Sequence, residues 1–295
     1  MRSLIDGIRR GKCIAVSLVL LTAAIFSSAS CAHAQETYFV TYSHHMEEPG
    51  NLEIGHKSVM GSPRGANAFL AHTLEFEYGV KAWWTSELYL DSQTTWSESS
   101  VFTGFRLENR FRPFMREHWI NPVLYVEFED INSADKSLLE VVGHDGREDF
   151  LKRNERSERK REAELKLILS SNFKGWNLSE NIVAEKNLAN EPWEFGYAVG
   201  VNRPLASAAN ATRCTVCREN FVVGAEMYGG LGDRYSFGLN RTSHYLAPVV
   251  GWEIPNGPTL KISPGFGLND YSHGFLFRFG VSYEIQQLAS KLRRR

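Results

Sequence analysis

Acidic and basic side chains recur at alternate positions along much of this chain. Glu75 and Glu77 are separated by one residue, as are Arg106, Glu108 and Arg110. Residues at this spacing share one face of a β-strand. Such rows could line an aqueous path for small solutes, with a carboxylate excess that disfavours anions. They could also pair with one another and fill the interior of a narrow barrel.

The alternation predicts one set of lumen-lining residues in which carboxylates outnumber cations. The set is Glu53, Glu75, Glu77, Glu87, Asp91, Arg106, Glu108, Arg110, Glu127, Glu129, Lys166, Glu194, Glu226, Lys261, Arg278 and Glu284. We interpret it as the wall of a narrow channel or transporter, and a plugged structural or adhesive barrel stays an alternative.

Serine and histidine residues raise a second alternative, an outer-membrane hydrolase that acts on lipid. Such chemistry needs a serine within hydrogen-bond reach of a histidine base. Ser243-His244 and Ser272-His273 cannot form a dyad within themselves, because adjacent strand residues point to opposite faces. His72 would need a partner from another strand, for instance Ser58. A structural histidine is the commoner meaning, so no catalytic residue is assigned.

Two further clusters, of cysteines and of histidines with glutamates, give weaker indications of function. Cys214 and Cys217, in RCTVCRE, are expected to form a small disulfide, because Arg218 stands where a haem attachment site needs histidine. His44-His45 and Glu47-Glu48 could contact a metal, but consecutive residues rarely supply a complete ligand set. We therefore expect no metal and no cofactor. The net charge of -1 gives no reason to expect nucleic acid.

The elements that must position these residues are β-strands. FLFRFGVSYE, at Phe275–Glu284, puts aromatic and aliphatic residues on one face and Arg278, Gly280, Ser282 and Glu284 on the other. The same alternation predicts twelve strands, at 51–60, 66–79, 81–93, 99–112, 120–131, 163–173, 176–187, 191–203, 219–231, 242–254, 258–268 and 274–285.

The remaining segments complete the predicted organisation. A basic start, the apolar stretch 14–26 and Ala32-His33-Ala34 predict a signal peptide at 1–34; lipidation of Cys31 is the alternative. Residues 35–50 are expected to be a periplasmic lead-in, of which 36–46 could be a partial strand. The barrel is predicted at 51–285, with an external charged insertion at 132–162 and a basic periplasmic tail at 286–295.

These features favour an all-β, antiparallel, up-and-down transmembrane barrel over a soluble sandwich. Aromatic residues including Trp84, Phe111, Trp176 and Trp252 fall near strand ends on one predicted side. An aromatic ring at one headgroup level is typical of membrane barrels. A closed barrel also satisfies every backbone group without leaving an edge.

On this pattern the chain resembles the Gram-negative outer-membrane β-barrel class, and more loosely barrels related to channels of aromatic-compound degradation pathways. The resemblance covers residues 51–285. It implies residence in the outer membrane, contact with its lipid, and insertion by the barrel-assembly machinery. Barrels of this class often end on an aromatic residue, whereas here QQLASKLRRR follows Tyr283 and Glu284.

Overall fold

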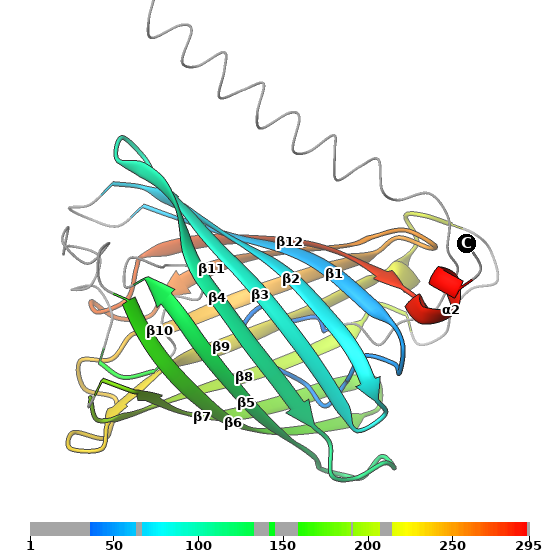
Figure 1. Cartoon of the computed structure of the whole chain (residues 1–295), viewed down its shortest axis with the longest axis horizontal. Coiled ribbons are helices and arrows are strands. Elements are labelled where there is room, and N and C mark those ends of the chain that lie inside the picture. Colours follow the sequence, from blue (N-terminus) through cyan, green and yellow to red (C-terminus); the bar gives the residue numbers. More distant parts are fainter. Residues whose placement is uncertain are drawn as a thin grey trace, which may run out of the picture.

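The computed structural model describes residues 36–62, 67–132, 142–144, 159–189, 191–206 and 214–293. Its strands form one closed antiparallel barrel in which each strand pairs with its neighbours in sequence and β12 pairs with β1 (Figure 1). The twelve strands are β1 (Leu52–Gly61), β2 (Phe69–Lys81), β3 (Trp84–Thr95), β4 (Ser99–Phe111), β5 (Asn121–Asn132), β6 (Arg159–Phe173), β7 (Trp176–Asn187), β8 (Trp193–Pro204), β9 (Phe221–Asp233), β10 (His244–Glu253), β11 (Thr259–Gly267) and β12 (Phe275–Ile285). The predicted all-β up-and-down barrel is confirmed, and a two-sheet sandwich is excluded.

The predicted charged insertion at 132–162 is partly wrong, because residues 159–162 belong to β6. The side chains of Arg159 and Arg161 point outward and both contact the carboxylate of Asp130 on β5. This cross-strand pairing extends the β5–β6 hairpin and neutralises charge on its outer surface. Most of the insertion, 133–141 and 145–158, lies outside the described residues.

The alternation of faces places polar side chains inside the barrel and most large apolar ones outside. On β12, Phe279 is 38% exposed, whereas its neighbour Arg278 is 2% exposed. Burial alternates along the other strands in the same way. Outward leucine, valine and phenylalanine side chains suit a lipid environment, and the closed ladder suits it equally.

One end of the barrel, called the α2 end here, carries the start of β1, the end of β12 and the short helix α2 (Leu288–Arg293) (Figure 1). No described helix is long and apolar enough to cross a membrane. Aromatic pairs gather at this end, for example Trp84 with Phe111 and Phe221 with Trp252. The connection between β8, which ends at Pro204, and β9, which begins at Phe221, is a long one at this end.

Cys214 and Cys217 are joined by a disulfide in this long connection. The side-chain amide of Asn220 donates hydrogen bonds to the carbonyls of Cys214 and Thr215, and the indole of Trp252 donates a further one to Thr215. The expected small disulfide is therefore present, and it stiffens a loop that is hydrogen-bonded to the end of the barrel.

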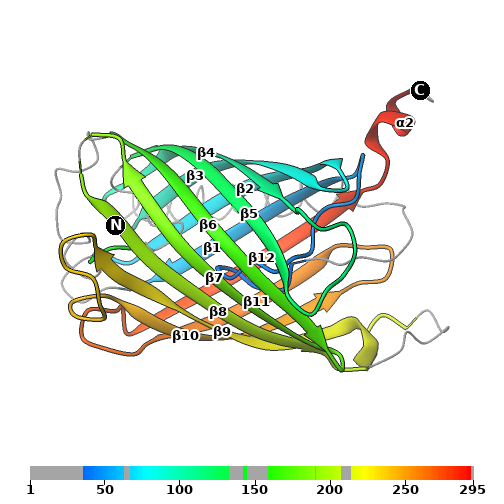
Figure 2. The ribbon, with the colours of Figure 1, turned by 90° about the horizontal axis from the view of Figure 1, so that it is seen from below.

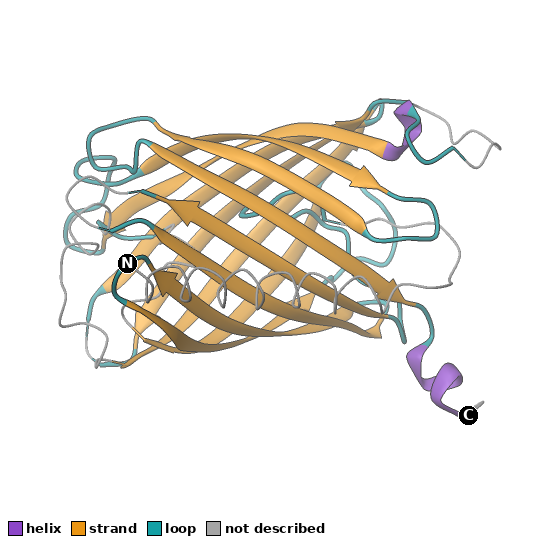
Figure 3. Ribbon diagram, turned by 90° about the horizontal axis from the view of Figure 1, so that it is seen from above, coloured by secondary structure: helices purple, strands orange, loops and turns teal. Residues whose placement is uncertain are grey.

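The segment ahead of β1 is not a periplasmic lead-in, because it lies inside the barrel. Figures 2 and 3 show this irregular chain within the ring of strands. Tyr38, Thr41, Ser43 and His44 are buried there. The segment makes no strand pairing; side chains from the barrel wall hold it instead. We call residues 36–48 the plug.

Candidate functional site in the barrel lumen

The predicted lumen residues face the interior of the barrel. Those that are buried are Glu53, Glu75, Glu77, Glu87, Asp91, Arg106, Glu108, Arg110, Glu127, Glu129, Glu226, Lys261 and Arg278. Lys166, Glu194 and Glu284 are partly buried. The structure gathers most of these residues into two unlike regions of the lumen, which we call the acidic wall and the aromatic wall.

Arg110 is the centre of the acidic wall. Its guanidinium contacts the carboxylates of Glu77, at 2.5 Å, and Glu87, and its Nε lies 3.1 Å from Glu108. One cation thus bridges three carboxylates from β2, β3 and β4. An arginine fork suits such bridging, because its donors are planar and always charged.

Other ion pairs continue this wall along β1 to β6. Arg106 lies 2.9 Å from Asp91 and 3.7 Å from Glu127. Lys57 contacts Glu75 at 2.8 Å, and Lys166 contacts Glu164 at 3.0 Å. The acidic wall is therefore residues Lys57, Glu75, Glu77, Glu87, Asp91, Arg106, Glu108, Arg110, Glu127, Glu164 and Lys166. Its cations contact carboxylates on their own strand or on neighbouring strands, and Arg110 on β4 also reaches Glu77 on β2.

Inward tyrosines belong to this wall and are absent from the predicted set. The hydroxyl of Tyr89 donates to Glu87 and Glu108, and that of Tyr125 donates to Glu127 at 2.8 Å. Both tyrosines share the face of their neighbouring carboxylates in sequence, at positions i and i+2. That shared face is the signal that could have identified them.

The aromatic wall lies mainly on β8 to β12 and extends onto the neighbouring strands β1 and β2. Its apolar members form one buried cluster, which is Val59, Phe69, Ala71, Ala198, Tyr228, Tyr245, Ala247 and Leu276. Tyr228 and Tyr245 stack with ring centroids 5.3 Å apart. Sequence reasoning placed polar residues inside and missed this apolar patch. Leu276 shares the face of Arg278, which was the available signal.

Two charged residues stand beside this cluster, Glu226 on β9 and Arg278 on β12. The guanidinium of Arg278 lies over the ring of Tyr228, 4.8 Å from its centroid, and Nη1 is 3.9 Å from the Glu226 carboxylate. Among the described residues, neither terminal nitrogen of Arg278 donates a hydrogen bond, although the side chain is buried. This arginine differs in that respect from Arg106 and Arg110.

Glu226 holds the plug from the other side. Its carboxylate accepts three successive backbone N–H groups, from Phe39 at 3.2 Å and from Val40 and Thr41 at 2.9 Å each. The Val40 side chain packs against the apolar cluster. A charged acceptor with several N–H donors makes strong hydrogen bonds, so Glu226 is the main latch of the plug.

Further contacts fix both ends of the plug. Lys261 donates to the carbonyls of Glu36 and Tyr38, and the amide of Asn181 both accepts from and donates to the Tyr42 backbone. The Tyr42 hydroxyl donates to Glu108 at 2.9 Å, which ties the plug to the acidic wall. The plug thus touches both walls through polar groups that water could replace.

Glycine makes room for the plug at one point of the wall. A Cβ added at Gly200, on β8, would lie 2.5 Å from the ring of Tyr38. That separation is well below van der Waals contact, so a larger residue at this position excludes the observed plug. Gly251, on β10, has no such neighbour, because its nearest contact would be 3.8 Å away.

Burial shifts two titratable groups of the plug in opposite directions. Desolvation lowers the pKa of His44 to about 4, and neighbouring His45 adds to the effect. Desolvation raises the pKa of Glu47 to about 7, assisted by the negative charges of Glu284 and Glu53. The docked plug therefore favours neutral His44 and protonated Glu47.

Little space remains between the plug and the acidic wall. The cavity lined by Tyr38, Tyr42, Lys57 and Arg110 holds about 20 Å³. That volume suits roughly one water molecule. The plug therefore lies close against the acidic wall at this point.

Three acidic-wall carboxylates lie close enough to share a metal ion. The ligand atoms of Glu75, Glu77 and Glu87 are within 4.8 Å of one another. Lys57 and Arg110 already contact these carboxylates and balance their charge. The cluster therefore gives no independent sign of a metal.

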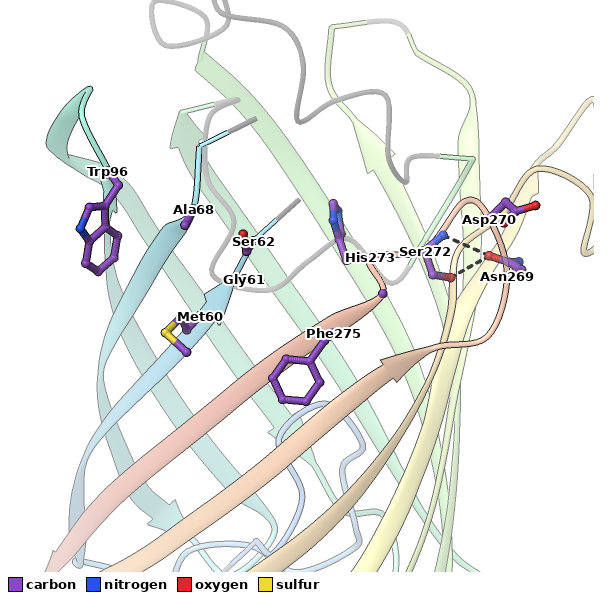
Figure 4. Close-up of a pocket in the computed structure, with 11 residues that line it drawn as sticks. Met60, Gly61, Ser62, Ala68, Trp96, Asn269, Asp270, Ser272, His273 and Phe275 are labelled. Atoms are coloured by element: carbon purple, nitrogen blue, oxygen red, sulfur yellow. Dashed lines mark hydrogen bonds between the residues drawn. The ribbon is translucent and has the colours of Figure 1, made fainter. Parts of the chain in front are cut away.

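The suggested pairing of Ser58 with His72 is present on the outer face of the barrel. Ser58 Oγ lies 3.1 Å from His72 Nδ1 across the β1–β2 pair, and the His56 ring stacks on His72 with centroids 5.4 Å apart. A pocket of about 700 Å³ adjoins β1 at the end opposite α2 (Figure 4). Met60 and Phe275 line its apolar side.

The other serine–histidine pairs have different partners. His244 Nδ1 lies 3.0 Å from the Tyr197 hydroxyl and Nε2 lies 2.9 Å from Thr242 Oγ1. Ser272 Oγ donates to the carbonyl of His244 and accepts from its backbone N–H. These contacts are structural and form no serine–histidine side-chain dyad. His44 likewise contacts a serine, with Nδ1 2.8 Å from Ser170 Oγ.

Comparison with known proteins identifies the architecture only. No protein-family model matches the sequence. No curated protein matches it either. Among solved structures, the COG4313 outer membrane channel from Pseudomonas putida F1 is similar with a TM-score of 0.54 at 8% identity, over 82% of this chain and 98% of that one. KdgM porin gives 0.48 at 7% identity (78% and 98%), and NanC porin gives 0.47 at 12% (79% and 100%).

These findings define a class. The chain is a closed antiparallel β-barrel with the fold of a solved outer membrane channel. Such identities show a shared fold and nothing about a shared solute. What the barrel does must therefore be argued from its lumen.

Proposed function

We propose that this protein is an outer-membrane channel for small solutes, whose path runs through the barrel and is closed by the plug in the present state. In this proposal the signal peptide ends near Ala34, and the plug is the start of the mature chain. Solute passes when residues 36–48 leave the lumen or shift within it. The acidic wall then faces water and favours cations over anions.

The observation that carries the proposal is the way the plug is held. An irregular segment occupies the lumen through hydrogen bonds from Glu226, Asn181 and Lys261, and it adds no strand to the sheet. Water can replace each of these partners, because the wall behind them is polar or charged. The barrel closes its own ladder without the plug, so its removal leaves no sheet edge.

The fold offers support of a coarser kind. The similar structure with a TM-score of 0.54 is described as an outer membrane channel. A permanently filled structural barrel is the competing interpretation, since the acidic wall is densely paired. The two differ in one measurable respect, which is whether removal of the plug opens a conducting path.

The test is conductance in planar bilayers. We expect rare openings for the full chain and a larger, sustained conductance when residues 36–46 are deleted, with reversal potentials that show preference for cations. Glu226→Gln should give an intermediate increase, because an amide accepts the three N–H groups less strongly than a carboxylate. A folded deletion variant that stays electrically silent would refute the channel.

Lipid hydrolysis is a second candidate, favoured by the hydrogen bond between Ser58 and His72. The pair lies on the outer face, and Met60, two positions from Ser58 on β1, lines a pocket that neither Ser58 nor His72 lines. Among the described residues, His72 contacts no carboxylate that would orient it. A fluorophosphonate probe should label Ser58, and Ser58→Ala and His72→Asn should abolish both labelling and release of fatty acid from phospholipid. An unlabelled, inactive folded protein eliminates this candidate.

A further inference from the structure

We infer that Glu226, Arg278 and the apolar cluster form a binding site for a small α-amino acid with an apolar side chain, and that Val40 of the plug occupies this site in the closed state. The inference rests on the proposed function, because such a solute can enter only where the plug yields. It adds a chemical class of solute to the channel.

The plug presents a set of hydrogen-bond donors to Glu226. Three N–H groups, from Phe39, Val40 and Thr41, converge on one buried carboxylate. An ammonium group offers the same number of donors on a single atom and adds a positive charge. A primary ammonium is therefore a natural replacement for the plug at this acceptor.

The guanidinium of Arg278 lies over the Tyr228 ring and near Glu226, but its two terminal nitrogens donate no hydrogen bond among the described residues. Arg278 is 2% exposed, so these unused donors are buried. A buried guanidinium with unused donors is costly, and a carboxylate is the group whose geometry best matches its fork. Ser263 Oγ, on the neighbouring strand position, is likewise buried without a hydrogen bond within the described chain.

The charges of Arg278 and Glu226 lie close to each other. Arg278 Nη1 lies 3.9 Å from the Glu226 carboxylate, which is longer than a charge-assisted hydrogen bond. One α-carbon separates the ammonium and carboxylate of an amino acid, so both groups can reach such neighbouring partners together. A zwitterion also keeps the local charge balanced, whereas a simple anion would lie beside Glu226 and a simple cation beside Arg278.

An apolar surface lies next to Glu226 and Arg278. The Val40 side chain packs against the cluster that contains Val59, Phe69, Tyr228 and Leu276. A free amino acid with a branched aliphatic side chain can bury the same area in the same place. The plug thus behaves as a covalently attached competitor, and any solute that binds must displace it at a cost in apparent affinity.

The experiment is isothermal titration of the folded full-length protein in detergent with L-valine. The probes for comparison are isovalerate, which lacks the ammonium, isobutylamine, which lacks the carboxylate, and glycine, which lacks the side chain. We expect saturable binding of L-valine and at least about tenfold weaker binding of each comparison probe, since each loses a charged or apolar contact. Gly200→Ala loosens the plug through Tyr38 and should strengthen L-valine binding severalfold.

Substitutions of single arginines test whether Arg278 is part of the L-valine site. Arg278→Met should weaken L-valine binding by about tenfold or more, and Arg278→Lys, which keeps the charge but loses the fork, should weaken it less. Arg161→Met removes a cation from the outer surface of β6 and should leave the affinity unchanged. Heat-modified mobility on gels establishes that each variant is folded before titration.

The outcomes separate this inference from the channel itself. If neither the unmodified chain nor Gly200→Ala binds L-valine, or if Arg278→Met binds it equally well, the amino-acid site is refuted while conductance can still stand. If L-valine binds and Arg278→Met abolishes binding, but the plug deletion never conducts, the site stands and the channel fails. Equal binding of isovalerate or isobutylamine would overturn the zwitterion.

Discussion

The two walls of the lumen use arginine in opposite ways. On the acidic wall, Arg110 contacts three carboxylates and Arg106 contacts two. On the aromatic wall, Arg278 lies over a tyrosine ring and is 3.9 Å from a carboxylate whose acceptor capacity serves the plug. The difference indicates that the first wall holds the barrel together, whereas the second is available to something that enters.

The largest expected effect follows from replacing the two arginines. Arg110→Met leaves three buried carboxylates without their shared cation, and breaking a buried ion pair typically costs about 3–5 kcal/mol. Arg278→Met leaves only Glu226, which three N–H groups already satisfy, so its main loss is the contact with the Tyr228 ring, on the order of 1 kcal/mol. Urea unfolding in detergent micelles, followed by tryptophan fluorescence, measures both.

A control and a contrary result sharpen that comparison. Arg161→Met, at an exposed contact with Asp130, should change the free energy of unfolding by less than about 1 kcal/mol. If Arg278→Met destabilised the barrel as much as Arg110→Met, both arginines would be structural. The functional distinction between the walls would then be lost.

An intermediate effect is expected at the glycine that admits the plug. Gly200→Ala places a Cβ against the Tyr38 ring, and the plug must shift, because the strand cannot. We expect severalfold more frequent channel openings in planar bilayers. Gly251→Ala, whose Cβ meets only ordinary contacts, is the matched control. Unchanged opening in Gly200→Ala would mean that the docked plug does not control conduction.

The sequence predicted the barrel well, because strand alternation is a local property. Each predicted strand overlaps an observed one, and the largest boundary error is at β6, where Arg159 and Arg161 extend the strand beyond the apolar pattern. In the sequence, the charged residues Arg159 and Arg161 resembled part of a solvent-exposed loop. Its partner Asp130 belongs to a different strand, so the sequence around β6 could not reveal the pairing.

The content of the lumen was harder to predict, because it depends on contacts between distant residues. Glu226 meets Val40 across 186 positions, and Lys261 meets Glu36 across 225. No periodicity in ETYFVTYSHHM indicates that this segment turns back into the barrel. The inward direction of Arg278 was predictable from its strand. That its two terminal nitrogens donate no hydrogen bond among the described residues was not predictable.

The smallest expected effect is a pH dependence of plug docking, in which two groups act in opposite directions. Glu47 has an ordinary pKa of 4.5 and a docked pKa of about 7, raised by desolvation and then by Glu284 and Glu53. The docked state binds this proton more tightly than the free segment does. Its contribution to docking is therefore present at low pH and is lost as pH rises through 7.

Channel opening should accordingly increase between pH 6 and pH 8, by up to about tenfold, through this one group. Glu47→Gln keeps the shape of the protonated acid and should flatten the increase. His44, whose pKa falls from 6.5 to about 4, acts in the other direction, because docking loses its contribution as pH falls below 6.5. The groups that act on His44 are His45, Glu117, Glu36 and Arg112.

Because the two contributions oppose each other and largely cancel, opening of the unmodified chain should be least frequent near pH 5.5, midway between the pKa values of the two groups, and should rise only about two- to threefold by pH 8. In His44→Gln only Glu47 titrates, so opening should increase steadily from pH 4 to pH 8, whereas in Glu47→Gln only His44 titrates, so opening should decrease over the same range; single-channel recordings at pH 4, 5.5 and 8 measure both. A profile that neither substitution alters would place the titrating groups elsewhere, and the plug would then dock without proton linkage.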